Sequence, residues 1–120
     1  MARVLGLGGV VLRAARVAET RDWYARVLGL EMQDWGGAMF RPLEQGVVTF
    51  SLFDASTPYF DPSTASAMIN FVVDDLDGVL SRAAGEGVAP LAREDADPNG
   101  RFAWLLDPEG VKVELWEPRP

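Results

Sequence analysis

The chain repeats one arrangement of strands and helix, and this internal repeat constrains the fold more than any other feature of the sequence. The tail, FAWLLDPEGVKVELWEP at 102–118, has the pattern of a strand, a tight turn and a second strand. A weaker copy, FRPLEQGVVTFSLFD, occupies 40–54, with Gly46 in the place of Gly110. In each half, a strand-like run and an amphipathic helical pattern precede this pair. The sequence therefore predicts an α+β fold made of two βαβββ units in one chain.

The predicted organisation is a single domain, 1–120, with unit one at 1–54, a linker at 55–66 and unit two at 67–120. For unit one we expect a helix at Arg21–Leu28, with Thr20 as N-cap and Gly29 as the stop. Its expected strands are Gly6–Arg13, Glu31–Trp35, Ala38–Arg41 and Val47–Phe53. For unit two the expected strands are 67–73, 88–91, 101–106 and 111–116, with a helix from Leu76 to the glycines at 85–87 and a solvated acidic turn over 93–100.

The composition removes several classes of chemistry. The chain has no cysteine and no histidine, so thiolate nucleophiles, Cys-based metal sites and imidazole bases are all absent. Its formal charge of −7, without a basic stripe, opposes a nucleic-acid partner. No apolar run approaches the ~20 residues of a membrane span, and the N-terminus lacks a cleavage pattern. We therefore expect a cytoplasmic protein with no nucleic-acid and no membrane partner.

The two βαβββ units, WYARVLGLEM at 23–32 and LDPEGVKVELWEP at 106–118 resemble the vicinal oxygen chelate superfamily, which includes glyoxalase I, bleomycin resistance proteins and extradiol dioxygenases. The resemblance covers nearly the whole chain. It implies that each unit curls into a half-barrel and that two units pair to enclose a cavity. At this length, it also implies a homodimer.

The resemblance also implies where a metal would be held, because metal-dependent members place His or Glu on the first and fourth strands of each unit. The matching positions here are Gly9, Ser51, Met68 and Glu114, of which only Glu114 is a possible ligand. One carboxylate does not make the three or four ligands that a transition metal normally takes. The prediction is therefore no metal and no other cofactor.

Strand alternation predicts which side chains line the cavity: with Glu114 inward, Lys112 and Trp116 share its face, while Val113 and Leu115 pack against a helix. Glu114 is the candidate general base or anchor for a cationic ligand, and the alternative is a structural ion pair with Arg13 or Lys112. The predicted ligand-binding residues are mixed apolar and polar, as small-molecule sites generally are: Arg13, Trp35, Thr49, Ser51, Phe53, Tyr59, Phe60, Met68, Asn70, Arg101, Trp104, Lys112 and Trp116.

Three functions remain open on the sequence alone. The first is a metal-free protein of the bleomycin resistance type that sequesters a small, partly aromatic or cationic drug or metabolite in the dimer cavity. The second is a metal-independent isomerase or lyase that uses Glu114 as base, with Asn70, Ser51 or Thr49 donating hydrogen bonds to a developing oxyanion. The third is a partner-binding or structural dimer whose cavity is filled by its own side chains.

Overall fold

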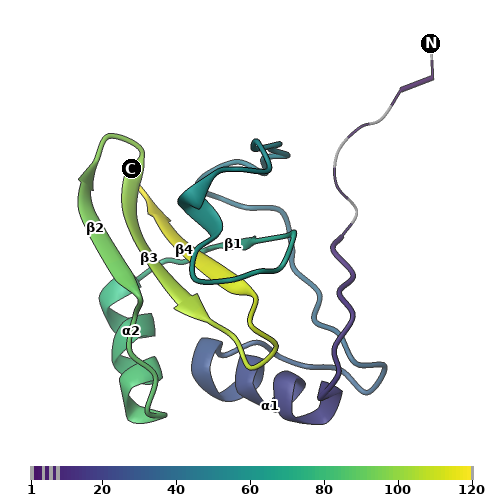
Figure 1. Cartoon of the computed structure of the whole chain (residues 1–120). Coiled ribbons are helices and arrows are strands. Elements are labelled where there is room, and N and C mark those ends of the chain that lie inside the picture. Colours follow the sequence, from purple (N-terminus) through teal and green to yellow (C-terminus); the bar gives the residue numbers. More distant parts are fainter. Residues whose placement is uncertain (1, 4, 6, 8, 120) are drawn as a thin grey trace.

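The computed structural model describes residues 2, 3, 5, 7 and 9–119. Its regular elements are the helices α1 (Val17–Leu28) and α2 (Leu76–Gly85), a short 3-10 helix at Pro58–Phe60, and four strands (Figure 1). The strands are β1 (Ile69–Val72), β2 (Ala92–Asp97), β3 (Gly100–Leu106) and β4 (Lys112–Pro118). The fold is thus mixed α+β, and 69–118 form the βαβββ unit predicted for the second half.

The four strands form one sheet in the order β1-β4-β3-β2. β1 runs parallel to β4, and the pairs β3–β4 and β2–β3 are antiparallel. The register places Asn70 and Trp104 on either side of Glu114. Residues paired in this way project from the same face of the sheet, so three polar or aromatic side chains from three strands meet at one place.

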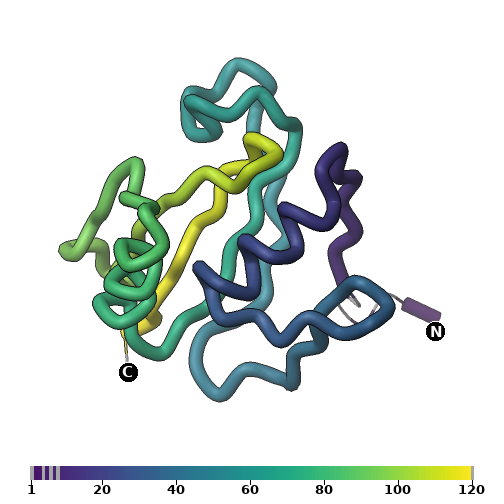
Figure 2. The backbone as a smooth tube through the Cα atoms, turned by 90° about the horizontal axis from the view of Figure 1, so that it is seen from below, coloured from purple at the N-terminus to yellow at the C-terminus, as the bar shows by residue number. Residues whose placement is uncertain are grey.

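Both helices pack on the other face of this sheet, as the view from below shows (Figure 2). Helix α1 contributes Trp23, Tyr24 and Val27, which recur at helical spacing and so form one apolar face. Leu76, Leu80 and Ala83 of α2 meet them over the β3 and β4 side chains Ala103, Leu105, Val113 and Leu115. This core leaves the opposite face of the sheet without an α-helix.

Helix α1 begins earlier than the sequence predicts, and Thr20 is not its N-cap. The helix starts at Val17 with Arg16 at the cap position, and Arg16 makes no side-chain cap hydrogen bond. Instead, the Glu109 carboxylate accepts the backbone N–H groups of Ala15 and Arg16 at 3.0 and 2.8 Å and the Thr20 hydroxyl at 2.9 Å. A distant carboxylate therefore supplies the acceptor that the local sequence lacks. The predicted stop is correct, since Gly29 caps the helix at φ 73°.

The first half of the chain contributes α1 but no strand among the residues described. Residues 9–13, 31–35, 38–41 and 47–53 carry no strand assignment, and residues 6 and 8 of the predicted first strand lie outside the described residues. The predicted Gly-Gly connection does form a turn, in which Gln33 N–H bonds the Gly37 carbonyl at 2.8 Å. A strand needs a neighbouring strand for its backbone hydrogen bonds, and among the described residues these segments pair with no strand. They meet the sheet through side chains, as Phe40 does with Phe71 of β1 at 6.0 Å between ring centroids.

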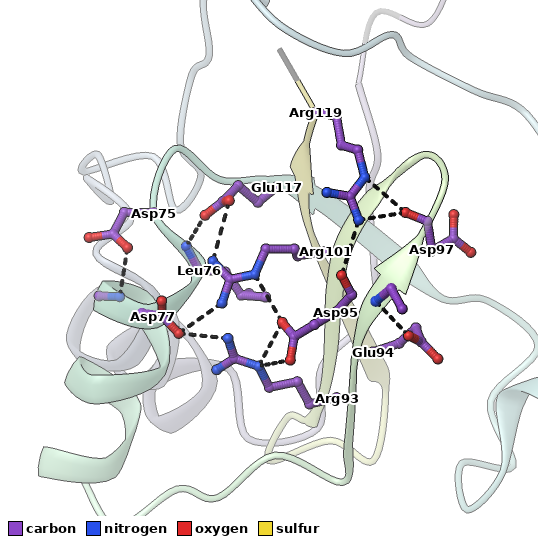
Figure 3. A network of polar contacts seen from close by, with 12 residues as sticks. Asp75, Leu76, Asp77, Arg93, Glu94, Asp95, Asp97, Arg101, Glu117 and Arg119 are labelled. Carbon is purple, nitrogen blue, oxygen red and sulfur yellow. Dashed lines mark hydrogen bonds and ion pairs between the residues drawn. The ribbon is translucent and has the colours of Figure 1, made fainter.

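Two predictions for the second half are also wrong in detail. Residues 88–91 form no strand, although the Leu91 N–H does bond the Trp104 carbonyl at 2.7 Å. The acidic segment 93–100, predicted as a solvated turn, is largely the edge strand β2. Ion pairs explain the difference, because Asp77 and Asp95 each pair with both Arg93 and Arg101 (Figure 3). These pairs offset the poor strand propensity of the acidic residues, and a charged edge strand also resists unwanted pairing.

Candidate functional site: the free face of the sheet

The free face of the sheet carries polar and aromatic side chains that alternate with the core residues. On β4, Val113 and Leu115 are fully buried towards the helices, whereas Glu114 and its neighbours Lys112 and Trp116 are partly exposed on the opposite side. The alternation predicted for this strand is therefore confirmed. Phe102 and Trp104 of β3 share the free face, because they pair with Trp116 and Glu114 across the ladder.

Glu114 lies at the centre of a hydrogen-bonded cluster. Its Oε1 accepts a hydrogen bond from Asn70 Nδ2 at 2.6 Å, and its Oε2 accepts one from Trp104 Nε1 at 2.8 Å. Oε2 also accepts the hydroxyl of Tyr59, which comes from the 3-10 helix on the linker. Charge-assisted hydrogen bonds of this kind are stronger than neutral ones, so the carboxylate fixes an amide, an indole and a phenol from three separate segments.

This arrangement differs from the ion pair that the sequence offered as the structural alternative for Glu114. Neither Arg13 nor Lys112 forms an ion pair with it in the described part of the chain. Lys112 instead donates to the backbone carbonyl of Tyr59 at 2.7 Å. The partners of Glu114 are neutral donors, which the linker and β1 bring to it.

The phenol of Tyr59 acts as a donor in this cluster. Burial raises the pKa of Tyr59 above its ordinary value, and its hydrogen bond to the Glu114 carboxylate raises it further. Tyr59 therefore stays protonated across the physiological range, and its hydroxyl donates a hydrogen bond to Glu114. Its ring meets the Trp104 ring edge-on, with centroids 6.2 Å apart.

A hollow of about 480 Å³ opens between the linker and β3, and we call it the Trp104 hollow. Its volume falls in the usual range for small-molecule sites. Two sides are aromatic: Phe53 and Tyr59 from the linker side, with centroids 5.4 Å apart, and Trp104 from the sheet. The residues that line it are Phe53, Thr57, Pro58, Tyr59, Ala92, Trp104 and Lys112.

An aromatic ladder continues from the hollow along the sheet. Phe102 stacks between Trp104 and Trp116, with centroids 6.1 Å from each and interplanar angles of 12° and 1°. The far end is fixed because Trp116 Nε1 donates to the Asn99 carbonyl at 3.0 Å. A stack of flat rings on an open sheet face offers a platform for another flat ring.

The structure brings some of the predicted site residues together and separates others. Seven of them lie in the Glu114 cluster, the hollow or the ladder: Phe53, Tyr59, Asn70, Trp104, Lys112, Trp116 and Glu114 itself. Phe60 packs edge-on against Phe53, and Met68 is half-buried just before β1. Arg13, Thr49 and Ser51 are exposed in the first half, and Trp35 is 66% exposed and lies beside Gly37.

Arg101 was predicted to line the ligand cavity, but its side chain lies on the helix side of the sheet. It pairs with Asp77 at 3.0 Å, Asp95 at 2.9 Å and Glu117 at 3.5 Å (Figure 3). The reason is alternation: Arg101 has the parity of the core residues Ala103 and Leu105, opposite to that of Trp104. Hydrogen bonds to Asp95 and Asp77 raise the pKa of its guanidinium further, so it remains a structural cation.

Four residues of this face were missed by the sequence predictions. Thr57, Pro58 and Ala92 line the hollow, and Phe102 forms the centre of the ladder. Phe102 has the same parity as Trp104, so strand alternation alone was enough to find it. Thr57 and Pro58 are placed by the long-range contact of the linker with β3, and Ala92 by its pairing with Trp104 across β2 and β3. No local pattern encodes these contacts.

The residues present do not fit the metal of the metal-dependent members. Of the positions matching the metal ligands, Gly9 has no side chain, Ser51 is exposed, and Glu114 is surrounded by N–H and O–H donors. Such donors stabilise a carboxylate that binds no metal ion. A metal site would instead place further acceptor atoms next to the carboxylate, as ligands of the ion. Among the described residues, no three Asp, Glu, His or Cys side chains lie close enough together to hold a metal ion.

The helices in the described part of the chain lack the length and apolar character that crossing a bilayer requires.

Comparison with known proteins now places the chain in a family. The model of the Glyoxalase/Bleomycin resistance protein/Dioxygenase superfamily matches residues 6–115. The chain belongs to this superfamily, which is the one that its sequence resembles. Comparison with the curated proteins gives no match.

Solved structures with the same fold include two that align over most of the chain. A protein from the mobile metagenome of V. pseudocholerae is 19% identical over 100% of this chain and 99% of its own, with a TM-score of 0.62. TnmS3, an antibiotic-binding protein from Streptomyces sp. CB03234, is 22% identical over 88% of each chain, with a TM-score of 0.56. At these identities the likeness concerns the fold.

A third structure aligns only in part. It is a glyoxalase/bleomycin resistance protein from Catenulispora acidiphila, 39% identical over 44% of this chain, with a TM-score of 0.39. The alignment spans about half of that protein's length, 48%.

Proposed function

We propose that this chain is a metal-free small-molecule-binding protein of the glyoxalase/bleomycin resistance type, which sequesters a drug or metabolite in the cytoplasm. The observation that carries the proposal is the Trp104 hollow, an aromatic concavity on the free face of the sheet. The antibiotic-binding relative TnmS3, which shares the fold, agrees with this class of function.

The hydrogen bonds of Glu114 support binding over turnover. A general base must have an acceptor position within reach of the proton that it removes, and three of the roughly four positions of the Glu114 carboxylate already accept hydrogen bonds from the protein. Asn70, the predicted donor to an oxyanion, points its amide at the same carboxylate. The alternative, a metal-independent isomerase or lyase with Glu114 as base, leaves the base one acceptor position on Oε1 unless a ligand displaces one of these donors.

We further propose that the protein works as a homodimer, in which the first-half segments of two copies complete the cavity. The first half places large apolar side chains in solvent, among them Val11 at 96% and Leu52 at 86% exposure. Apolar surface of this extent is rare on a monomer and marks an interface. Thr49, Ser51 and Arg13, which make no hydrogen bond or ion pair with Glu114 in the described chain, are the residues that a second copy would bring to the cavity.

The binding function is tested by a thermal-shift screen of natural products against protein treated with EDTA. A ligand is expected to raise the melting temperature of the wild type and of Arg82→Ala, a control at an exposed position of α2, but not that of Trp104→Ala. Circular dichroism checks that both variants are folded, and mass spectrometry of the recovered ligand separates sequestration from turnover. If no compound stabilises the protein, or if Trp104→Ala responds like the wild type, the hollow is not the binding site.

A further inference from the structure

The charges around the Trp104 hollow point to the kind of ligand that it takes. Lys112 is the charged residue among those lining it, and Glu114 is not part of the lining. The Glu114 carboxylate lies behind Tyr59 and Trp104, whose donors it accepts. A ligand in the hollow therefore meets an ammonium group directly and the carboxylate only through two aromatic side chains.

The ammonium of Lys112 is held in place but keeps donors free. Its Nζ donates to the Tyr59 carbonyl at 2.7 Å and lies 5.3 Å and 5.8 Å from the ring centroids of Tyr59 and Trp104. An ammonium has three donors and no acceptor, so two N–H groups remain after the bond to Tyr59. In the described part of the chain, no carboxylate forms an ion pair with Lys112.

The same contacts disfavour a cationic ligand. The faces of Tyr59 and Trp104 attract a cation through their quadrupoles, but Lys112 already lies over both rings. A second cation would have to approach a like charge in a partly desolvated site, which is unfavourable. An anionic ligand is favoured, because it accepts a charge-assisted hydrogen bond from a free N–H of Lys112 in addition to stacking on the rings.

We infer that the ligand is a planar aromatic molecule with an anionic group, such as an aromatic carboxylate or phenolate. Its ring packs against Trp104 and Phe53, and its anionic group bonds to Lys112. Glu114 is a positioning residue, because it orients Tyr59 and Trp104 and does not itself touch the ligand. This inference rests on the proposed binding function and narrows it to one chemical class.

Three probes of the same shape and different charge test the inference: 2-naphthoate, 2-naphthamide and 2-naphthylmethylammonium. Their dissociation constants are measured by isothermal titration calorimetry on the EDTA-treated full-length chain. The wild type is expected to bind naphthoate about tenfold more tightly than naphthamide, the gain of one charge-assisted hydrogen bond, and the ammonium probe most weakly. Lys112→Met is expected to remove the preference for the anion, and Lys112→Arg to retain it. Arg119→Met, which removes a cation elsewhere on the molecule, is the matched control and is expected to leave the preference intact.

The role of Glu114 has its own readout in the same assay. Glu114→Gln is expected to weaken the binding of all three probes by a similar factor, because Tyr59 and Trp104 lose the carboxylate that orients them. The ratios between the three dissociation constants should stay the same. Selective loss of the ammonium probe in this variant would make Glu114 a direct contact for a cation and overturn the inference.

Other outcomes distinguish a failure of the anion preference from a failure of the proposed binding function. If the probes bind at the hollow without a preference for the anion, or if the preference survives in Lys112→Met, the inference is wrong and the binding function stands. If none of the three probes binds, binding of aromatic molecules at this hollow is itself wrong, and the inference falls with it.

Discussion

At the scale of single residues, the chain uses carboxylates to hold aromatic side chains in place. Glu114 accepts the hydroxyl of Tyr59 and the indole N–H of Trp104 on the free face of the sheet. On the helix face, Asp107 accepts the Tyr24 hydroxyl at 2.7 Å and the backbone N–H groups of Glu109 and Val111. Asp107 thus orders its own turn and also ties that turn to α1.

The bond between Tyr24 and Asp107 gives a stability prediction. Tyr24→Phe removes a buried hydrogen bond to a charged acceptor and leaves the ring packed, so we expect a loss of about 2 kcal/mol in the free energy of unfolding. Urea denaturation measures it. Tyr59→Phe is the matched control at the other tyrosine of the chain, and it should cost less because Tyr59 is more exposed than Tyr24, 38% against 9%. Equal losses in the two variants would contradict this account.

The pH dependence of the same variant has a definite sign. Burial, together with the bond to Asp107, raises the pKa of Tyr24 above its ordinary value of 10.0. The folded state therefore keeps a proton that the unfolded state releases, so the contribution is complete below pH 10.0 and falls as the pH rises above it. Wild-type stability should decline more steeply than that of Tyr24→Phe above this pH, and parallel curves would contradict the shift.

At the scale of elements, the DPEG turn between β3 and β4 serves as the cap of α1. Glu109 of this turn accepts two backbone N–H groups and one hydroxyl at the start of the helix, and Arg16 returns a hydrogen bond to the Pro108 carbonyl. The contact joins the helix of the first half to the hairpin of the second. The turn therefore has a role beyond reversing the chain direction.

This contact predicts a local effect of Glu109→Ala. Without the carboxylate, the N–H groups of Ala15 and Arg16, directly before α1, and the hydroxyl of Thr20 lose their acceptor, so we expect faster hydrogen exchange at residues 15–20 and little change in α2. The matched control is Glu44→Ala, at an exposed glutamate. Unchanged exchange at 15–20 would show that the helix start is held by packing alone.

The hydrogen bonds to Glu109 also lower the pKa of its carboxyl group. In the wild type, the protection of residues 15–20 against hydrogen exchange should therefore be complete above the ordinary pKa of 4.5, and it should be lost as the pH falls through the lowered pKa.

The elements that the sequence predicts correctly are those fixed by local patterns. The two helices follow from apolar spacing, the DPEG turn from proline and glycine, and the inward face of β4 from alternation. Strand β2 escapes prediction because it is formed by antiparallel pairing with β3, to which ion pairs of Arg93 and Arg101 with Asp77 and Asp95 are added. The partners of Glu114 are missed for a similar reason: Tyr59 reaches it from 55 positions away, and no local pattern encodes that contact.

At the scale of the whole molecule, the second half of the chain packs around a closed core, whereas the first half leaves much of its apolar surface exposed. The second half has a closed core under a four-stranded sheet. The described first-half residues 9–13 run apart from this sheet (Figure 1), and the apolar residues of 47–53 are exposed. The short edge strand β1 keeps one side of its backbone unpaired within the described chain, which is the kind of edge that accepts another strand.

The proposed dimer follows from this asymmetry. Sedimentation equilibrium is expected to give twice the chain mass of 13.1 kDa at micromolar concentration. Val11→Asp and Leu52→Asp should shift the protein to monomer without unfolding it, because both side chains are exposed in the single chain. Ala84→Asp, at an exposed position of α2, is the control and should stay dimeric. A wild type that sediments as a monomer would contradict the proposal.

The central claim is that this protein binds a flat small molecule at the Trp104 hollow without a metal. The most direct test is an NMR titration of the indole N–H resonances of ¹⁵N-labelled, EDTA-treated protein with 2-naphthoate and 2-naphthamide, with assignments from Trp104→Phe and Trp23→Phe. The account predicts that the Trp104 resonance moves and saturates with at least one probe, while that of Trp23, buried between the helices and the sheet, stays in place. An unmoved Trp104 resonance, or a shift that appears only after a divalent metal is added, would contradict it.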